Sequence, residues 1–258
     1  MRNLLFKLQY AGTKYHGWQV QENALAVQQV VQDGVHRITG NRDGVTGCSR
    51  LDSGVHAAAY YFTVRTQCAL AADKFAPALN TVLPRDMAVL DCCEVSPSFH
   101  PRYSAVNKTY EYKIWNSKYR NPFYEKLMWH YPHNINLSKL KETAEGFIGT
   151  HDFSSFCAAR AKKQDSHVRT IFTFEAEKND GILTLRITGD GFLYNMVRII
   201  TGTLVDLRRQ NVTREDISEI ISAGDRSKAG KTAPAHGLYL VGVEYERQYC
   251  ANISAFFS

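Results

Sequence analysis

The sequence contains few cysteines, and no two of them form a Cys-x-x-Cys pair. The six cysteines are scattered over 258 residues, at Cys48, Cys68, Cys92, Cys93, Cys157 and Cys250. Structural zinc sites need clustered thiolates or imidazoles, and disulfide frameworks are typical of short secreted chains. The cysteine pattern therefore argues against both kinds of site and predicts a cytoplasmic protein with reduced thiols.

Long apolar runs are also absent. No segment approaches the roughly 20 consecutive apolar residues that span a bilayer, and the apolar run at residues 4–6 is too short for a signal peptide. No glycine-rich loop has the pattern that cradles phosphates. Because 44% of the residues are hydrophobic and 22% are charged, the chain can bury an ordinary core. We therefore expect a soluble folded protein with no membrane partner.

Positive charge is in slight excess, with a formal net charge of +6, which alone does not indicate a nucleic acid partner. The cations gather in three stretches: Arg160, Lys162, Lys163, His167 and Arg169; Arg226, Lys228 and Lys231; and Lys118 and Arg120, which lie among aromatic residues. One such stretch is often only a solvated face. Several on one small chain favour a polyanionic partner that is bound through its phosphates.

Hydrophobic periodicity predicts an α+β arrangement in the first part of the chain. The predicted elements are, in order, a strand over 4–10, an amphipathic helix marked by Val27 to Ile38, strands near 44–50 and 59–66, a short helix near 73–80, and a strand near 86–95. Residues 96–107 contain two prolines and little periodicity, so they are predicted to cross to a second half.

The second half is predicted to repeat this mixture of strands and helices. Its elements are a strand over 109–115, a helix over 137–147, a hairpin of 170–177 and 182–188 that turns at 178–181, a long helix from Leu193 to Leu207, a short helix capped by Thr213 with Asp216, and a strand over 239–245. This order of strands, helices and hairpins indicates the α+β class with largely antiparallel sheets. We predict an N-terminal half over 1–103, a C-terminal half over 104–248 and a tail over 249–258.

The most informative stretch is residues 48–56, which read Cys-Ser-Arg-Leu-Asp-Ser-Gly-Val-His between two predicted strands. A turn here can present Arg50 and Asp52 at the end of a sheet, with Gly54 free to adopt dihedral angles closed to other residues. Taken alone, an Asp before Ser-Gly is most often a simple turn former. Motifs elsewhere in the chain change that interpretation.

Residues 49–56 resemble the Gly-Arg-Thr-Asp-Ala-Gly-Val-His signature of the TruA family of transfer-RNA pseudouridine synthases. Further blocks are similar to segments of that family in the same order: Tyr10–Gln19, Phe99–Ala105 followed by Lys108–Tyr112, His151–Phe156, Met196–Arg198 and Gly237–Leu240. Because these ordered blocks span nearly the whole chain, the sequence is identified as a member of the family.

The sequence departs from the family pattern at a few positions. Leu51 and Ser53 replace the Thr and Ala of the signature, and Ala11 replaces the Asp of the amino-terminal Tyr-Asp-Gly. The Arg, Asp, Gly, Val and His positions of the signature are retained. These changes bear on which uridines are modified more than on whether the chemistry occurs.

The resemblance implies two ferredoxin-like halves of the pseudouridine synthase fold, whose mainly antiparallel sheets meet at a central cleft. It implies a stand-alone isomerase that converts uridine to pseudouridine in the anticodon stem-loop of transfer RNA, at positions 38–40 in the family, and that acts as a homodimer. The reaction moves the attachment of the base from N1 to C5, so it requires no metal, redox cofactor or nucleoside triphosphate.

The resemblance also assigns roles to single residues. Asp52 would be the catalytic carboxylate, and Arg50 would help to extrude the target nucleotide, since a uridine stacked in RNA cannot reach a protein carboxylate. Tyr110 would stack on the flipped base, Arg198 would pair with Asp52 as a bidentate cation, and Leu240 would form an apolar wall beside the base. Basic residues are further candidates for substrate binding: Arg160, Lys162, Lys163 and Arg169.

Other interpretations remain open from the residues alone. Asp52 attacks C6 of the ring, attacks C1′ of the sugar, or stabilises an elimination intermediate. Arg50 has a structural alternative as an ion partner within the protein, Arg198 as a surface cation and Tyr110 as a core aromatic. The histidines His56 and His151 are interpreted as structural, because no second metal ligand lies at helix or turn spacing.

Two other functions compete with the synthase. One is an RNA-binding or RNA-folding protein on the same scaffold, with catalysis weakened by Leu51 and Ser53, but a binder needs none of the triad Asp52, Tyr110 and Arg198. The other is a glycosidase that acts on a free nucleoside. Hydrolysis usually takes two carboxylates, and only one candidate acid is found.

Overall fold

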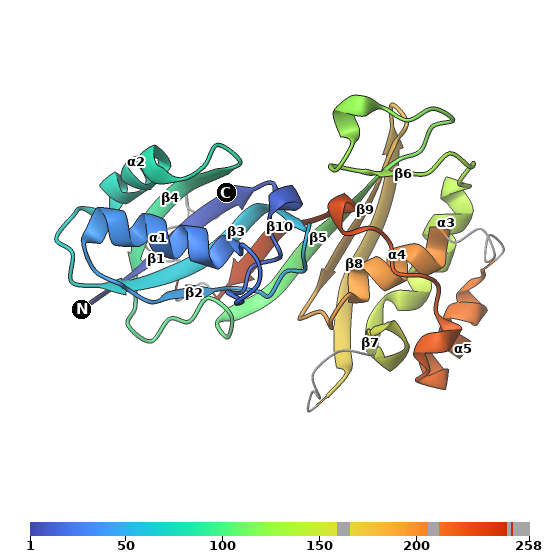
Figure 1. Ribbon diagram of the computed structural model, residues 1–258. Coiled ribbons are helices and arrows are strands. Elements are labelled where there is room, and N and C mark those ends of the chain that lie inside the picture. The colour runs from blue at the N-terminus through green and yellow to red at the C-terminus, as the bar shows by residue number, and fades with distance from the viewer. Residues whose placement is uncertain (159–165, 206–211, 247–248, 250–258) are drawn as a thin grey trace. The chain divides into compact units, whose positions relative to one another are not determined.

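The computed structural model describes residues 1–158, 166–205, 212–246 and 249 of the chain (Figure 1). The chain forms two compact units, of which the first is Met1–Asn107 together with the chain from Leu240 onward, and the second is Lys108–Tyr239. The sequence-based division placed residues up to 248 in the second half. The structure moves that boundary, because the last strand adds to the sheet of the first unit.

Within the described residues, the first unit combines β-strands of a sheet with two α-helices. Its elements are β1 (Arg2–Tyr10), α1 (Val27–Thr39), β2 (Val45–Gly47), β3 (His56–Thr66), α2 (Ala72–Val82), β4 (Met87–Val95) and β10 (Leu238–Tyr245). The strand order is β4-β1-β3-β10, and β2 pairs with β3. The pairs of β1 with β3, β1 with β4, and β2 with β3 are antiparallel.

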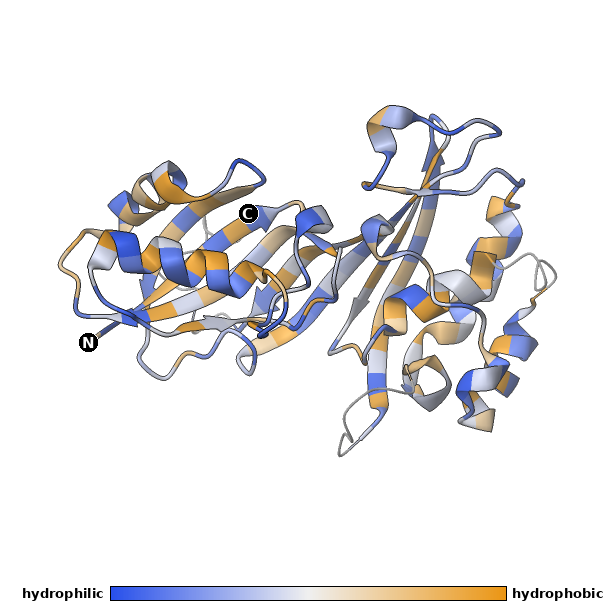
Figure 2. Cartoon of the chain, viewed as in Figure 1, coloured by the Kyte–Doolittle hydropathy of each residue, from blue (hydrophilic) through white to orange (hydrophobic). Residues whose placement is uncertain are grey.

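Continuous burial explains the central place of β1 in this sheet. Successive residues of a strand point to opposite faces, and nearly all of β1 is buried, so both faces are covered. On one face, the ring of Phe6 stacks on Phe62 of β3 at 4.7 Å and meets Phe75 of α2 edge-on at 5.8 Å. Polar and apolar residues alternate along α1, which packs beside α2 (Figure 2).

Within the described residues, the second unit contains mostly antiparallel strands and three α-helices. Its elements are β5 (Ala105–Trp115), whose first residues still belong to the first unit, β6 (Trp129–His130), α3 (Leu137–Ala144), β7 (Gly149–Asp152), β8 (Val168–Asn179), β9 (Ile182–Gly189), α4 (Met196–Val205) and α5 (Arg214–Ala223). The strand order is β5-β9-β8-β7 with antiparallel pairing, and β6 pairs with β5 in parallel.

The core of the second unit is built around α4. All its residues except Arg198 and Leu204 are buried, as is typical of a helix in a protein interior. α3 packs against α4, α5 and β8. Three phenylalanines of this core are fully buried, and Phe156 meets both Phe147 and Phe153 edge-on.

The predicted fold class is confirmed, since the chain mixes helices with mostly antiparallel strands. The hairpin turn is also confirmed, with positive φ at Asp180 and Gly181, and Thr213 and Asp216 form the predicted capping box of α5. The helix predicted from Leu193 begins later, at Met196, because Asn195 has a φ of +63° that interrupts the helix. Leu207, its predicted end, lies outside the described residues.

Among the described residues, no helix has both the length and the apolar character needed to cross a membrane.

Candidate active site

The candidate catalytic loop connects β2 to β3 in the first unit. It places Asp52 half-buried and Arg50 exposed. The backbone N–H of Cys48 donates to the carbonyl of Tyr61 at 2.8 Å, and the Tyr60 hydroxyl donates to the carbonyl of Ser49. The loop therefore starts from fixed backbone, so the carboxylate of Asp52 is presented by a defined turn.

Glycine completes this turn. The N–H of Val55 donates to the carbonyl of Asp52 at 3.2 Å, and Gly54 between them has a φ of +79°, a conformation that side chains with a Cβ rarely adopt. The N–H of Gly54 donates to the carbonyl of Tyr15 at 3.1 Å. The signature glycine thus shapes the loop and also ties it to the amino-terminal motif.

The amino-terminal motif is the support on which the loop lies. A Cβ on Gly12 would stand 1.9 Å from the carbonyl oxygen of Val55, so only glycine allows this approach of two backbones. The N–H of Trp18 donates to the carbonyl of Leu51 at 3.1 Å, and the Trp18 ring stacks on Tyr60 at 4.1 Å. Two motifs that are separate in the sequence therefore form one structural feature.

His56 belongs to this support. Its side chain is 1% exposed, and its Nδ1 accepts a hydrogen bond from the N–H of Gly12 at 3.0 Å. An imidazole that accepts at Nδ1 is neutral and carries its proton on Nε2. His151 of the second unit is likewise engaged with backbone, since its Nε2 lies 3.1 Å from the carbonyl oxygen of Ile148. No group of three or more His, Cys, Asp or Glu within the described ranges could hold a metal ion.

The buried Tyr15 anchors the support to Asp86, the residue just before β4. The hydroxyl of Tyr15 donates to Oδ1 of Asp86 at 2.7 Å, and Nζ of Lys14 lies 3.3 Å from Oδ2 of the same carboxylate. The side chain of Asp86 is only 18% exposed, whereas that of Lys14 is 77% exposed. Burial and the Asp86 carboxylate raise the pKa of Tyr15 well above its ordinary value, so its hydroxyl remains a donor at neutral pH.

Removing this hydroxyl should weaken the first unit. We expect Tyr15→Phe to lower the free energy of unfolding by about 1.5 kcal/mol, because a shielded carboxylate loses a hydrogen bond while Lys14 still contacts it. Urea denaturation measures the change. Tyr103→Phe is the control, since the Tyr103 side chain is largely exposed and its change should stay below about 0.5 kcal/mol. Equal effects of both variants would contradict an anchoring role for Tyr15.

Tyr110 lies on β5 in the second unit. It is paired with Ile187 of β9 and is 5% exposed. Phe192 meets its ring edge-on at 5.0 Å, which fixes the ring on the side of β9. Tyr110, the predicted stacking residue, is therefore as buried as an aromatic residue of the core.

Arg198 is half-buried on α4, and its guanidinium is fixed by neighbours in the second unit. Nε donates to the carbonyl of Ala233 at 2.8 Å, and one terminal nitrogen donates to Oδ1 of Asn195 at 2.6 Å. The N–H of Ala233 returns a bond to the carbonyl of Arg198 at 3.0 Å. The segment before β10 thus runs along α4 and orients the arginine before any substrate binds.

Two titratable groups lie close to this guanidinium. The hydroxyl of Tyr112 donates to the carbonyl of Pro234 at 2.7 Å, and burial raises the pKa of Tyr112 far above its ordinary value, against the opposing effect of Arg198. Burial lowers the pKa of His236, and the Arg198 charge lowers it further, while a hydrogen bond to the backbone of Met128 has the opposite effect. His236 is therefore held neutral beside a cation.

The lowered pKa of His236 predicts a pH dependence of stability. In the unfolded chain a histidine titrates near pH 6.5, so between that value and the lower folded pKa the unfolded state binds more protons. Stability must then fall as the pH drops through this window. We expect the free energy of unfolding to fall less from pH 7.5 to pH 5.5 in His236→Gln than in the wild type, as measured by urea denaturation. Parallel pH curves would refute this role of His236.

The other predicted site residues divide between the units. Leu240, on β10, belongs to the first unit and is fully buried. Arg169 is half-buried, and its guanidinium donates to the backbone carbonyls of Ser166 and Val168. The remaining basic candidates, Arg160, Lys162 and Lys163, lie outside the described residues.

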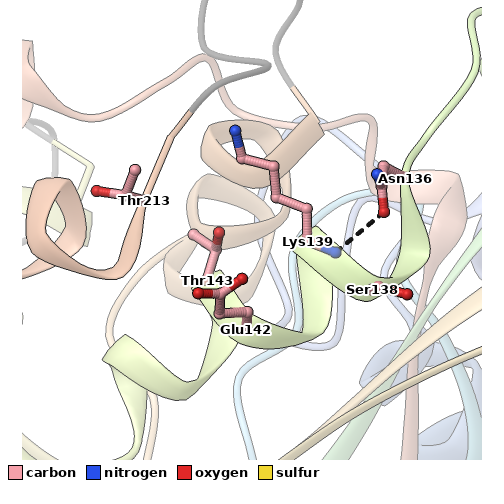
Figure 3. A pocket seen from close by; sticks show the side chains of 6 residues that line it. All are labelled: Asn136, Ser138, Lys139, Glu142, Thr143 and Thr213. Carbon is pink, nitrogen blue, oxygen red and sulfur yellow. Dashed lines mark hydrogen bonds between the residues drawn. The ribbon is translucent and has the colours of Figure 1, made fainter.

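A cavity of about 400 Å³ lies in the second unit (Figure 3). It is lined by Asn136, Ser138, Lys139, Glu142, Thr143 and Thr213. Each of these residues has a polar or charged side chain, and Asn136 uses its own to cap α3. The cavity contains none of the predicted catalytic or substrate-binding residues.

Sequence reasoning missed the residues that hold the candidate site in place. Asp86 and Asn195 act through side-chain oxygens and Ala233 acts through its backbone, and none of the three lies in a recognised motif. The signals for the support were the block Tyr10–Gln19, which contains Gly12 and Tyr15, and His56 at the end of the signature.

Comparison with known proteins decides the family. The profile of the tRNA pseudouridine synthase family matches residues 8–104 and 143–246. The chain belongs to this family. The matched ranges contain the loop with Asp52 and also Arg198 on α4, while Tyr110 lies between them.

Curated relatives of the family align over nearly the full chain. A protein of Thermoanaerobacter sp. (strain X514) is 42% identical over 245 residues, and one of Caldicellulosiruptor saccharolyticus is 43% identical over 245 residues. Each alignment covers 95% of this chain and 100% of the relative, and each relative is named tRNA pseudouridine synthase A. Among solved structures, a chain of a Cbf5–Nop10–Gar1 complex aligns over 92% of this chain and 49% of its own at 10% identity, with a TM-score of 0.43. This last likeness is too distant to add to the assignment.

Proposed function

We propose that the chain is a tRNA pseudouridine synthase, a cofactor-independent isomerase that acts on uridine in transfer RNA. The observation that carries the proposal is the carboxylate of Asp52, which stands on a glycine-shaped loop anchored to the amino-terminal motif in a chain of this family. In the reaction the N1–C1′ bond breaks and a C5–C1′ bond forms. The proton of C5 is lost and N1 gains one, so the change needs no oxidant or reductant.

The residues would divide this work as the family resemblance suggests. Asp52 would supply the carboxylate for the covalent or stabilising step. Arg50, exposed on the same loop, would help to extrude the target nucleotide and hold it. Tyr110 would stack on the uracil, with Leu240 as an apolar wall. Arg198, which is oriented by Ala233 and Asn195, would keep Asp52 ionised.

The family resemblance further suggests the target uridines, the cellular location and the oligomeric state. We infer that the target uridines lie in the anticodon stem-loop at positions 38–40, that the protein works in the cytoplasm, and that two copies form a homodimer. Phosphates would be contacted by a basic stretch that lies next to the family-like block at His151–Phe156. This stretch contains Arg160, Lys162, Lys163 and Arg169. The two names of relatives quoted above support the transfer RNA substrate.

Tritium release tests the proposal directly. A transfer RNA transcript labelled with tritium at C5 of uridine loses its label only when C5 exchanges its hydrogen for the sugar. We expect release in proportion to the pseudouridine formed, without added metal or cofactor. An RNA-binding protein without catalysis would bind the transcript and release nothing, and that result would favour the alternative function.

A further inference from the structure

The second unit presents large aromatic side chains to solvent from one short loop after β5. We call residues 117–127 the 117–127 loop. In it, Phe123 is 86% exposed, Tyr119 is 71% exposed and Leu127 is 37% exposed. Single exposed apolar residues are common on protein surfaces, but a group of them in one loop is typical of a binding surface.

The backbone of the 117–127 loop is fixed by hydrogen bonds from outside it. The indole N–H of Trp115 donates to the carbonyl of Tyr119 at 2.8 Å, and the hydroxyl of Tyr239 donates to the carbonyl of Leu127 at 2.6 Å. Between these points the chain makes a 3₁₀ turn over Pro122–Tyr124. The aromatic rings are therefore held outward by a defined backbone, which reduces the entropy that a ligand would have to overcome.

The aromatic ring of this loop that packs against the protein is that of Tyr124. Tyr124, next to Phe123, packs edge-on against Trp115 with a centroid separation of 5.2 Å. Asn121 caps the turn by accepting a hydrogen bond from the N–H of Phe123 at 3.0 Å. The exposure of Phe123 is thus a consequence of how the loop is built, and folding gains nothing from its ring.

Cations surround the exposed rings. Lys118 and Arg120 flank Tyr119, and Nζ of Lys118 lies 5.3 Å from the centre of the Tyr119 ring. Both cations are exposed, and neither pairs with a carboxylate within the described residues. The loop contains one further cation, Lys126, and one acid, Glu125. Its charge is therefore positive.

This combination of rings and charge identifies one occupant. A second copy of the chain would bring the same unpaired cations of two loops together, and their repulsion disfavours such a contact. A strand of unpaired nucleotides suits both features, since bases stack on aromatic rings and phosphates attract Lys and Arg. Bases in a duplex do not suit them, because their faces are covered by neighbours.

We infer that the 117–127 loop binds unpaired nucleotides of transfer RNA, with bases stacked on Phe123 and Tyr119 and phosphates at Lys118 and Arg120. This inference rests on the proposed function for the identity of the RNA. It adds a contact that is separate from the recognition of the target uridine by Asp52, Arg50 and Tyr110.

Variants of the rings provide the first test, with an unmodified transfer RNA transcript as the probe. The double variant Tyr119→Ala, Phe123→Ala should raise the Kd about tenfold or more, because stacking of each base is lost. Phe123→Trp should bind like the wild type, whereas Phe123→Leu, which keeps an apolar side chain without a ring, should weaken binding. Leu90→Ala, at an exposed apolar residue on β4, is the control and should leave the Kd unchanged.

Two further measurements separate stacking from charge. A blunt RNA duplex without unpaired nucleotides should bind the wild type and the double ring variant equally. Lys118→Gln with Arg120→Gln should lower the slope of log Kd against log salt by about 1.4, at about 0.7 for each single-strand phosphate contact. The ring variants should leave this slope unchanged.

The outcomes distinguish this inference from the proposed function. Tritium release by a wild type whose transfer RNA affinity is insensitive to all the loop variants would overturn the inference and leave the function intact. Ring-dependent binding of transfer RNA without any release of tritium would support the inference and contradict the proposed function. A wild-type dimer that sedimentation shows to become monomeric in the double ring variant, with no change in Kd for RNA, would show that a second copy occupies the loop instead.

Discussion

Asp52→Asn is expected to reduce pseudouridine formation by at least about 10³-fold, because the amide lacks the nucleophilic and charge-stabilising capacity of the carboxylate. Asn has nearly the same shape as Asp, so the turn at Gly54 and its bond to Tyr15 should persist. The free energy of unfolding should change by less than about 1 kcal/mol. Single-turnover assays with saturating enzyme measure the chemical step, and the Kd for the transcript should stay close to that of the wild type.

Asp152→Asn is the matched control for this variant. Asp152 is an exposed carboxylate that accepts hydrogen bonds from Ser154 at a 3₁₀ turn, so it also stands on a polar turn but in the second unit. Its substitution should leave the rate unchanged. Asp52→Asn with near-wild-type turnover would remove the assigned role of Asp52, whatever the control does.

Arg198→Ala is expected to have the second largest effect, and it should act on both stability and rate. Loss of the guanidinium leaves the carbonyl of Ala233 and the amide oxygen of Asn195 without their donor in a half-buried position, which costs about 1–3 kcal/mol. Activity should fall by at least about 10²-fold, because the proposed partner of Asp52 is also removed. Urea denaturation and single-turnover assays measure the two losses on the same protein.

Arg198→Lys separates the two roles. An ammonium can donate to one of the two oxygens, so stability should recover in part, but it cannot reproduce the planar fork of the guanidinium. Activity should therefore recover less than stability does. If Arg198→Lys restored full activity, a bidentate role for Arg198 would be contradicted.

Local chemistry explains what could be predicted from the sequence. The turn at Asp180 and Gly181 and the cap formed by Thr213 and Asp216 depend only on residues a few positions apart, and both are found as expected. The turn that contains Asp52 is predicted in the same way, since its residues are continuous, but the catalytic role of Asp52 rests on the family resemblance. Features that depend only on neighbouring residues can be predicted without knowing the fold.

Partners that are distant in the sequence could not be predicted. The hydroxyl of Tyr15 and the carboxylate of Asp86 are separated by 71 positions, and neither residue type specifies the other. Ala233 orients Arg198 through its backbone carbonyl, which every residue has. The return of the last strand to the first unit is likewise a choice of pairing partner, which strand periodicity does not contain.

The central claim is that this chain converts uridine to pseudouridine in transfer RNA through Asp52. The most direct measurement is to map pseudouridine at single-nucleotide resolution in an unmodified transfer RNA transcript after incubation with the purified wild type or with Asp52→Asn. The account predicts pseudouridine in the anticodon stem-loop with the wild type alone, while both proteins bind the transcript. Equal modification by the two proteins, or binding of the transcript by the wild type with no pseudouridine at any position, would contradict it.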